Sequence, residues 1–110
     1  MSPAASAAGP RIMVNGVSRA LQEEVRFDRS GVTSVDWHTY PVLMAPEAPD
    51  AIEIVLINHR DLPPYGAGEP ASVATAPAIA NAIFGATGAR VRTVPFTPER
   101  VEAALAHRTS

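Results

Sequence analysis

The sequence contains no cysteine and no lysine. Without cysteine, a disulfide scaffold, a zinc finger and a cysteine-ligated iron–sulfur cluster are all excluded. The nine basic residues are arginines, and they are dispersed along the chain among eleven acidic residues. Nucleic-acid-binding proteins need clustered positive charge, so we expect no nucleic-acid partner.

Long apolar runs are also missing. The longest strongly apolar stretch, residues 52–57, is interrupted by Glu53 and is far shorter than the roughly 20 residues that cross a bilayer. Residues 1–10 are Ala, Ser, Pro and Gly after the initial Met and lack the basic and leucine-rich regions of a secretion signal. We therefore expect no membrane span, a disordered lead-in over residues 1–14 and a cytoplasmic location, with the periplasm as the alternative for an assembled enzyme.

The chain length of 110 residues allows one small domain, and a chain of this size buries roughly two-thirds of its unfolded surface. Eleven prolines and seven glycines disfavour a long helical bundle and favour a loop-rich α+β chain. We expect a small mixed sheet with a β-hairpin and two to three short helices.

Apolar spacing and turn residues predict the individual elements. Helices are predicted at 17–24, with Ser18 as N-cap, at 77–87, ended by Gly88, and after the sequence Thr97-Pro98-Glu99. Strands are predicted at 25–28 and 32–37, which form the hairpin, at 52–57, which is apolar on both faces, and at 90–94. Residues 38–50 and 61–72 are rich in proline and are predicted to be irregular.

The sequence Gly66-Ala67-Gly68-Glu69-Pro70 is the main candidate for chemistry. Glycines permit positive φ and close approach of a ligand, and Pro70 restricts the backbone of Glu69. A carboxylate held in this way can act as a general base. The same pattern also fits a glycine-rich turn with a solvated glutamate.

Several motifs in the same order resemble the C-terminal end of the molybdopterin-binding large subunit of molybdenum hydroxylases. The branch includes enzymes that resemble isoquinoline oxidoreductase and nicotinate dehydrogenase within the xanthine dehydrogenase and aldehyde oxidase family. The resemblance covers residues 15–106. The motifs are residues 18–21, 23–25, 35–37, 40–43, 56–58, 66–70, 78–84, 86–92 and 95–98.

The resemblance implies a catalytic role for Glu69, because the glutamate of the GxGE motif is the active-site base in that family. These enzymes hydroxylate aldehydes or carbons beside a ring nitrogen, with oxygen derived from water. The resemblance also implies that Gly66, Ala67, Gly68 and Ser72 lie against the molybdenum–pterin cofactor. No residue of this chain is expected to ligate the metal.

Other residues fit a structural role as well as a functional one. Ser72 either donates to the pterin or starts a helix, and Asn81 either bonds across to a loop or contacts the cofactor. The three histidines lack metal-ligand spacing. Trp37 and Phe84 are expected in the core.

The family's large subunit is several times longer than this sequence, and residues 1–14 do not follow its pattern. We therefore expect residues 15–110 to be part of a molybdopterin-binding domain: a truncated frame, a remnant or a separately encoded piece. The expected partners are the remaining part of that subunit, an iron–sulfur subunit, and an aldehyde or N-heterocyclic substrate. Such a chain is active only when assembled. The alternative is a free-standing, non-catalytic α+β interaction module.

Overall fold

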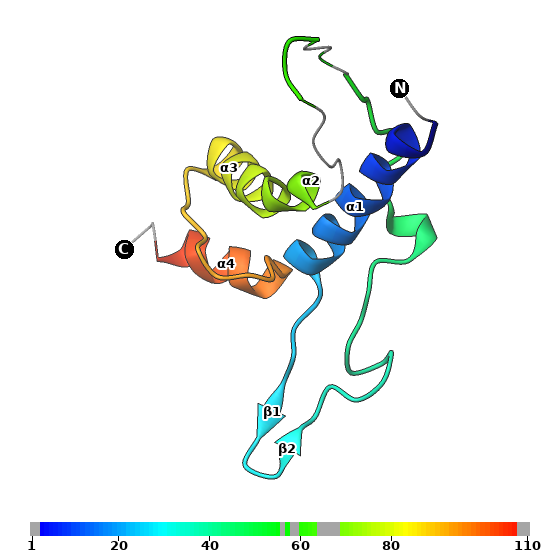
Figure 1. Ribbon diagram of the computed structural model, residues 1–110. Coiled ribbons are helices and arrows are strands. Elements are labelled where there is room, and N and C mark those ends of the chain that lie inside the picture. The colour runs from blue at the N-terminus through cyan, green and yellow to red at the C-terminus, as the bar shows by residue number, and fades with distance from the viewer. Residues whose placement is uncertain (1–2, 56, 58–59, 64–68, 108–110) are drawn as a thin grey trace.

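The computed structural model describes residues 3–55, 57, 60–63 and 69–107. The described residues form an α+β structure, as predicted, in which helices surround a small core and a hairpin projects from it (Figure 1). The elements are α1 (Pro3–Leu21), β1 (Phe27–Asp28), β2 (Gly31–Val32), the 3-10 helix η1 (Ala45–Glu47), α2 (Pro70–Val73), α3 (Thr75–Thr87) and α4 (Pro98–Ala106). None of the helices in these ranges is long and apolar enough to span a membrane.

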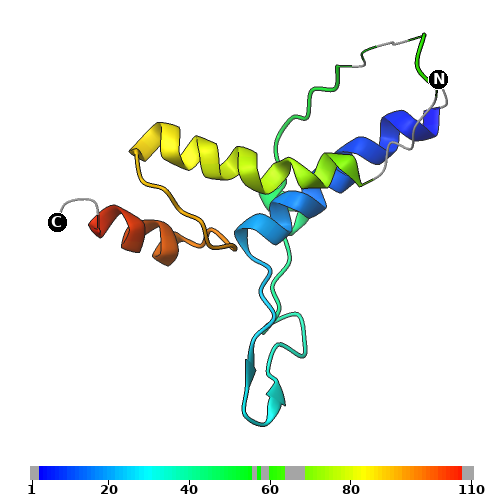
Figure 2. The ribbon, with the colours of Figure 1, turned by 60° about the vertical axis from the view of Figure 1, so that its left-hand side comes forward.

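Helix α1 crosses α2 and α3, and its C-terminal end lies near the start of α4 (Figures 1 and 2). In both views the β1–β2 hairpin points away from the helices. The only sheet within the described residues is this antiparallel pair, with Phe27 opposite Val32 and Asp28 opposite Gly31. The hairpin prediction is confirmed, with strands shorter than expected, whereas the mixed sheet is not found in these residues.

The N-terminal half of α1 occupies residues for which we expected a disordered lead-in. Alanines dominate residues 4–8, and alanine has the highest helix propensity, so a segment of this composition can extend a helix that is packed further along. Ser18 therefore lies inside the helix and is not its N-cap. Its side chain is buried, and Oγ accepts a hydrogen bond of 2.9 Å from the backbone N–H of Leu43.

A glycine allows α1 to approach the start of α3. A Cβ atom added at Gly16 would lie 2.8 Å from Oγ1 and 3.0 Å from Cβ of Thr75. Thr75 is buried, and its Oγ1 donates to the carbonyl of Ala71 at 3.1 Å, which ties α3 to α2. The position of α2 and α3 on α1 therefore depends on the absence of a side chain at residue 16.

The core is small and forms where α1, α3, α4 and the connection between α3 and α4 meet. Its buried members are Ala20, Val91 and Phe96. The backbone N–H of Phe96 donates to the carbonyl of Ala20 at 2.7 Å, which satisfies an acceptor in the last turn of α1. Residues 90–94 were predicted to be a strand, and this prediction is wrong: they form an irregular connection in which Val91 is buried.

The ends of α3 and α4 follow the local signals. Gly88 ends α3 in the left-handed conformation with φ of 69°. Thr97 precedes α4, with Pro98 and Glu99 in its first turn, as predicted. The Arg100 side chain of α4 donates to the carbonyl of Pro95 at 3.0 Å and pairs with the Glu24 carboxylate at 2.5 Å, so α4 is tied to the chain that follows α1.

The predicted buried strand at 52–57 is also wrong. The described residues 52–55 and 57 form no strand, and the side chain of Ile57 is 77% exposed. A buried strand needs neighbouring strands, and the described residues place none beside this segment. Trp37 and Phe84 are exposed and do not belong to the core.

We predict opposite effects for two glycine-to-alanine substitutions. Overpacking costs about 1–3 kcal/mol and alanine gains about 1 kcal/mol of helix propensity, so Gly16→Ala should lower the free energy of unfolding by up to about 2 kcal/mol. Gly85→Ala in α3 is the matched control, because its added Cβ would meet no atom within 4 Å apart from its chain neighbours and the backbone of its own helix. It should raise stability by about 0.5–1 kcal/mol. Chemical denaturation followed by circular dichroism measures both, and equal stabilisation by the two variants would contradict the close approach.

We also predict a pH-dependent contribution from Glu24. The hydrogen bond from Arg100 holds the pKa of Glu24 below its ordinary value of 4.5. A lowered pKa in the folded state contributes stability above pH 4.5 and loses it as pH falls through the lowered value. The stability difference between wild type and Glu24→Gln should therefore be largest near neutral pH and shrink in acid. Chemical denaturation at a series of pH values measures this difference. Arg100→Gln removes the donor and should give a similar loss near neutral pH, and a difference that does not change with pH would contradict the role of this bond.

Candidate functional site

Glu69 lies directly before α2, and it is exposed. Pro70 occupies the first helical position, where its missing N–H leaves no bond unmade. The other predicted members of this loop, Gly66, Ala67 and Gly68, lie outside the described residues. The structure thus presents the predicted catalytic carboxylate to solvent at the start of a short helix that packs on α1.

Ser72 holds the turn that carries Glu69. The carbonyl of Glu69 accepts hydrogen bonds from the Ser72 backbone N–H at 2.9 Å and from its Oγ at 2.8 Å. This geometry supports the helix-starting alternative for Ser72, because the hydroxyl proton is used within the turn. The hydroxyl oxygen keeps acceptor capacity, so contact with a cofactor stays a prediction.

A hollow of about 150 Å³ lies beside this turn. Its lining residues are Gly16, Arg19, Ala20, Ser72, Ala76 and Val94. Arg19 and Ser72 both line this hollow. Guanidinium groups bind carboxylates and phosphates well. Sequence reasoning did not single out Gly16 or Arg19, because no local signal showed that this part of the helix lies beside Ser72 and Ala76.

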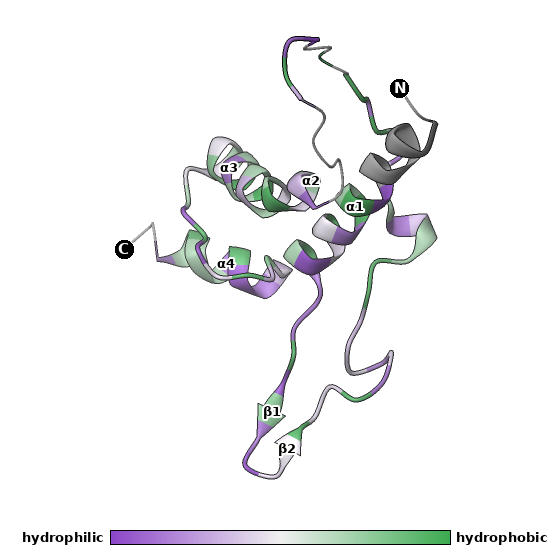
Figure 3. Ribbon diagram, viewed as in Figure 1, coloured by the Kyte–Doolittle hydropathy of each residue, from purple (hydrophilic) through white to green (hydrophobic). Residues whose placement is uncertain are grey.

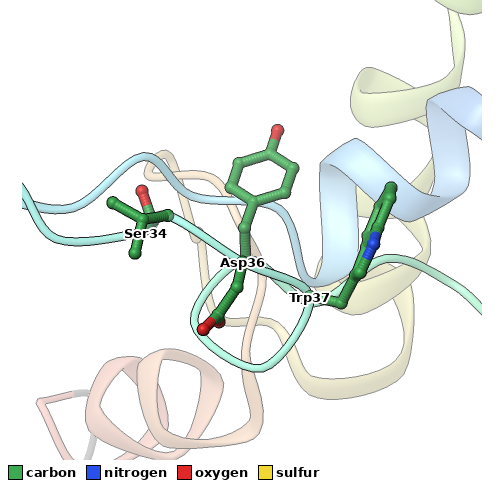
Figure 4. A pocket seen from close by; sticks show the side chains of 5 residues that line it. Ser34, Asp36 and Trp37 are labelled. Carbon is green, nitrogen blue, oxygen red and sulfur yellow. The ribbon is translucent and has the colours of Figure 1, made fainter.

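A second hollow lies in the loop that follows the hairpin. Ser34, Val35, Asp36, Trp37 and Tyr40 line it, and in Figure 4 the side chains of Asp36 and Trp37 point in different directions. The Asp36 carboxylate accepts bonds from the N–H groups of His38 and Thr39 and from Thr39 Oγ1. These bonds, that from the Thr39 N–H first, hold the pKa of Asp36 below its usual range. Asp36 therefore closes a turn, and we assign it no catalytic role.

The side chain of Tyr40 is held by a hydrogen bond to Glu23. Its hydroxyl donates to Glu23 Oε2 at 2.8 Å, and this bond raises the pKa of the Tyr40 phenol. The bond joins the loop after the hairpin to the chain that follows α1. The exposed side chains of Val35 and Trp37 form the apolar part of the lining of this hollow.

Asn81 forms the loop contact that one of its two interpretations predicted. Arg90 Nη1 donates to Asn81 Oδ1 at 3.3 Å, and the Arg90 guanidinium lies 3.4 Å from the centroid of the Phe84 ring. The exposed Phe84 ring is therefore covered in part by a cation, which is a favourable arrangement. Asn81 and Phe84 thus support the connection after α3.

The described residues fit only one part of a cofactor site. They contain no group of three or more His, Asp or Glu side chains placed to hold a metal ion. A charged pterin needs many convergent donors, whereas this region offers Glu69, Ser72 and Arg19. The arrangement can present a carboxylate at the edge of a site.

Comparison with known proteins points to large oxidoreductases. No protein-family model matches the sequence. The chain is 50% identical over 93 residues, 84% of its length, to a nicotinate dehydrogenase subunit of Pseudomonas putida. It is 35% identical over 97 residues, 84% of its length, to the aldehyde oxidoreductase of Megalodesulfovibrio gigas. It is 33% identical over 87 residues, 78% of its length, to the membrane-bound aldehyde dehydrogenase [pyrroloquinoline-quinone] of Gluconacetobacter polyoxogenes.

The chain spans about a tenth of the length of these relatives: 8% of the first, 10% of the second and 11% of the third. All three are oxidoreductases by name, and the similarities support a relationship to the molybdenum hydroxylase family that the sequence motifs resemble.

We predict that the Ser72 hydroxyl orders the turn at Glu69. In Ser72→Ala, the bond to the Glu69 carbonyl is lost, which should weaken the turn by about 0.5–1 kcal/mol. Amide hydrogen exchange at residues 71–73 should speed up accordingly. Ser72→Thr keeps the hydroxyl and should exchange like wild type. Unchanged exchange in Ser72→Ala would show that the backbone bonds alone hold the turn.

Proposed function

We propose that this chain is the glutamate-bearing C-terminal segment of a molybdenum hydroxylase large subunit. The observation that carries the proposal is the 50% identity to a nicotinate dehydrogenase subunit over 84% of the chain, combined with an exposed Glu69 in a turn fixed by Ser72. The reaction is the oxidation of an aldehyde or an N-heterocycle with oxygen derived from water. Nicotinate and aldehydes appear in the names of the relatives, which supports these two substrate classes.

Glu69 acts as the general base in this proposal. A carboxylate accepts a proton effectively only when it is placed against the reacting group, and such placement contributes about 10²–10⁴ in rate. The two bonds from Ser72 to the Glu69 carbonyl fix the backbone. Glu69 has helical dihedral angles (φ −54°, ψ −27°), although the proline that follows favours an extended conformation. The side chain then remains exposed, so that it can reach a substrate held by another part of the assembly.

The molybdenum–pterin cofactor supplies the two-electron oxidation and is held by the remaining part of the subunit. Gly66, Ala67 and Gly68 lie next to Glu69 in sequence, and in the proposal their small size lets backbone and cofactor come close. Ser72 and Arg19 lie on the adjacent hollow and can contact an anionic group there. In the proposal, an iron–sulfur subunit accepts the electrons, and the name of one relative as a dehydrogenase subunit supports assembly with other subunits.

A free-standing interaction module is less well supported. Among the described residues, no large side chain is fully buried, and the buried apolar residues are Ala20, Ala89, Val91 and Phe96. An independent domain of this length normally has a larger core. The exposed apolar side chains are better explained by further polypeptide that covers them.

The test replaces the matching segment of the Pseudomonas putida nicotinate dehydrogenase subunit by this chain. In the resulting enzyme, Glu69→Gln keeps the shape of the side chain but removes the base. Turnover should fall by about 10²–10⁴, with molybdenum content unchanged. Glu102→Gln, a second exposed glutamate on α4, should keep full turnover.

Near-normal turnover of Glu69→Gln would contradict its role as base. A chimaeric enzyme that folds and binds the cofactor but shows no turnover with the unmodified chain would favour the non-catalytic alternative. Metal analysis of the chain alone provides a further check, and we expect no bound molybdenum.

A further inference from the structure

Thr75, the first residue of α3, carries a buried hydroxyl group. In the part of the chain that the structure describes, the buried polar residues are Thr75 and Ser18. The rest of α3 is mostly apolar, as its colouring in Figure 3 shows. A buried hydroxyl is costly unless it is hydrogen-bonded, and Thr75 Oγ1 donates to the carbonyl of Ala71 in α2 at 3.1 Å. The side chain of Thr75 therefore joins α3 to α2.

The same side chain also lies directly against α1. A Cβ atom added at Gly16 would be 2.8 Å from Oγ1, 3.0 Å from Cβ and 3.3 Å from Cγ2 of Thr75. All three side-chain heavy atoms thus face the bare backbone of α1, which crosses α2 and α3 at this place (Figures 1 and 2). Thr75 is therefore in contact with α1 and α2 as well as being part of α3.

Helix α2 depends on such contacts because it has only four residues. A helix of this length is not stable by itself in water. Two hydroxyl groups donate to carbonyls along it: Ser72 Oγ to Glu69 at 2.8 Å and Thr75 Oγ1 to Ala71 at 3.1 Å. Since α2 begins directly after Glu69, the position of α2 on α1 sets the point from which the Glu69 side chain extends.

We propose that Thr75 is a positioning residue for Glu69. The inference rests on the proposed function, in which Glu69 is the general base. A base contributes only within hydrogen-bond reach of the proton that it removes, and a displacement of about 1 Å can cost about 10² in rate. Thr75 does not touch the reacting atoms. It holds α2 against α1, and α2 carries Glu69.

The experiment uses Pseudomonas putida nicotinate dehydrogenase that carries this chain in place of its own segment. Thr75→Val keeps the shape of the side chain but removes the hydroxyl. The maximal rate of enzyme reduction by nicotinate should fall about tenfold, with the half-saturating nicotinate concentration and the molybdenum content unchanged. Thr75→Ser keeps the hydroxyl and should restore most of the rate.

Thr87→Val is the matched control at the other end of α3. Thr87 Oγ1 donates to the carbonyl of Ile83 at 2.7 Å, the same kind of bond as that of Thr75. Its loss weakens the helix without touching α2, so the reduction rate should stay at that of the unmodified enzyme. Equal losses of rate in the two valine variants would show a general effect of stability and would overturn the positioning role.

A combined variant separates positioning from any other effect on the rate. If Thr75 acts through the Glu69 carboxylate, Thr75→Val should slow reduction no further once Glu69→Gln is present. A further tenfold loss in the combined variant, or loss of molybdenum in Thr75→Val, would contradict the inference.

Hydrogen exchange of the full chain alone gives a readout that needs no cofactor. Amides of residues 71–73 should exchange faster in Thr75→Val and like wild type in Thr75→Ser, and unchanged exchange in the valine variant would overturn the inference. An unchanged reduction rate in Thr75→Val, with Glu69→Gln still slow, would overturn the inference and leave the proposed function in place. An unchanged rate in Glu69→Gln would overturn the proposed function itself.

Discussion

The close approach of α1 to α2 and α3 is the contact on which the rest of the structure depends. It requires a residue without a side chain at Gly16, because Thr75 occupies the space that a Cβ would need. Thr75 in turn is bonded to Ala71 of α2, and α2 begins directly after Glu69. The position of the Glu69 carboxylate therefore depends on Gly16, which lies more than fifty residues earlier in the chain.

The same arrangement explains why the core stays small. Ala20 and Phe96 join the end of α1 to the connection before α4, and Arg100 adds an ion pair with Glu24 at the surface. These contacts order the helices but cover little apolar surface. Exposed ion pairs contribute little stability by themselves. The apolar side chains of Ile54, Val55, Ile57 and Trp37 are exposed, which supports the proposal that the chain is part of a larger subunit.

Sequence reasoning succeeded where local chemistry decides the structure. Gly88 ends α3 because glycine adopts the left-handed conformation without cost, and Thr97-Pro98-Glu99 begins α4 with residues suited to a first turn. The hairpin follows from alternating residues around a short turn at Arg29 and Ser30. The family relationship was also visible in the motifs, and the named relatives support it.

Sequence reasoning failed where tertiary contacts decide the structure. Ser18 has the chemistry of an N-cap, but a partner 25 residues away, the N–H of Leu43, uses its oxygen inside a longer helix. Residues 52–57 have the composition of a buried strand, but residues 52–55 and 57 form none, because no described residue provides a neighbouring strand. At the candidate site, Glu69 and Ser72 were identified from the sequence, whereas Arg19 was missed because its place beside Ser72 depends on the packing of α1 on α2 and α3.

The central claim is that Glu69 takes part in the chemical step of a larger enzyme. Anaerobic stopped-flow measurement of enzyme reduction by nicotinate, in nicotinate dehydrogenase carrying this chain, isolates that step from electron transfer and product release. The account predicts that Glu69→Gln slows reduction by about 10²–10⁴ while molybdenum content stays the same. Reduction of the Gln variant at the rate of the unmodified enzyme would contradict the account.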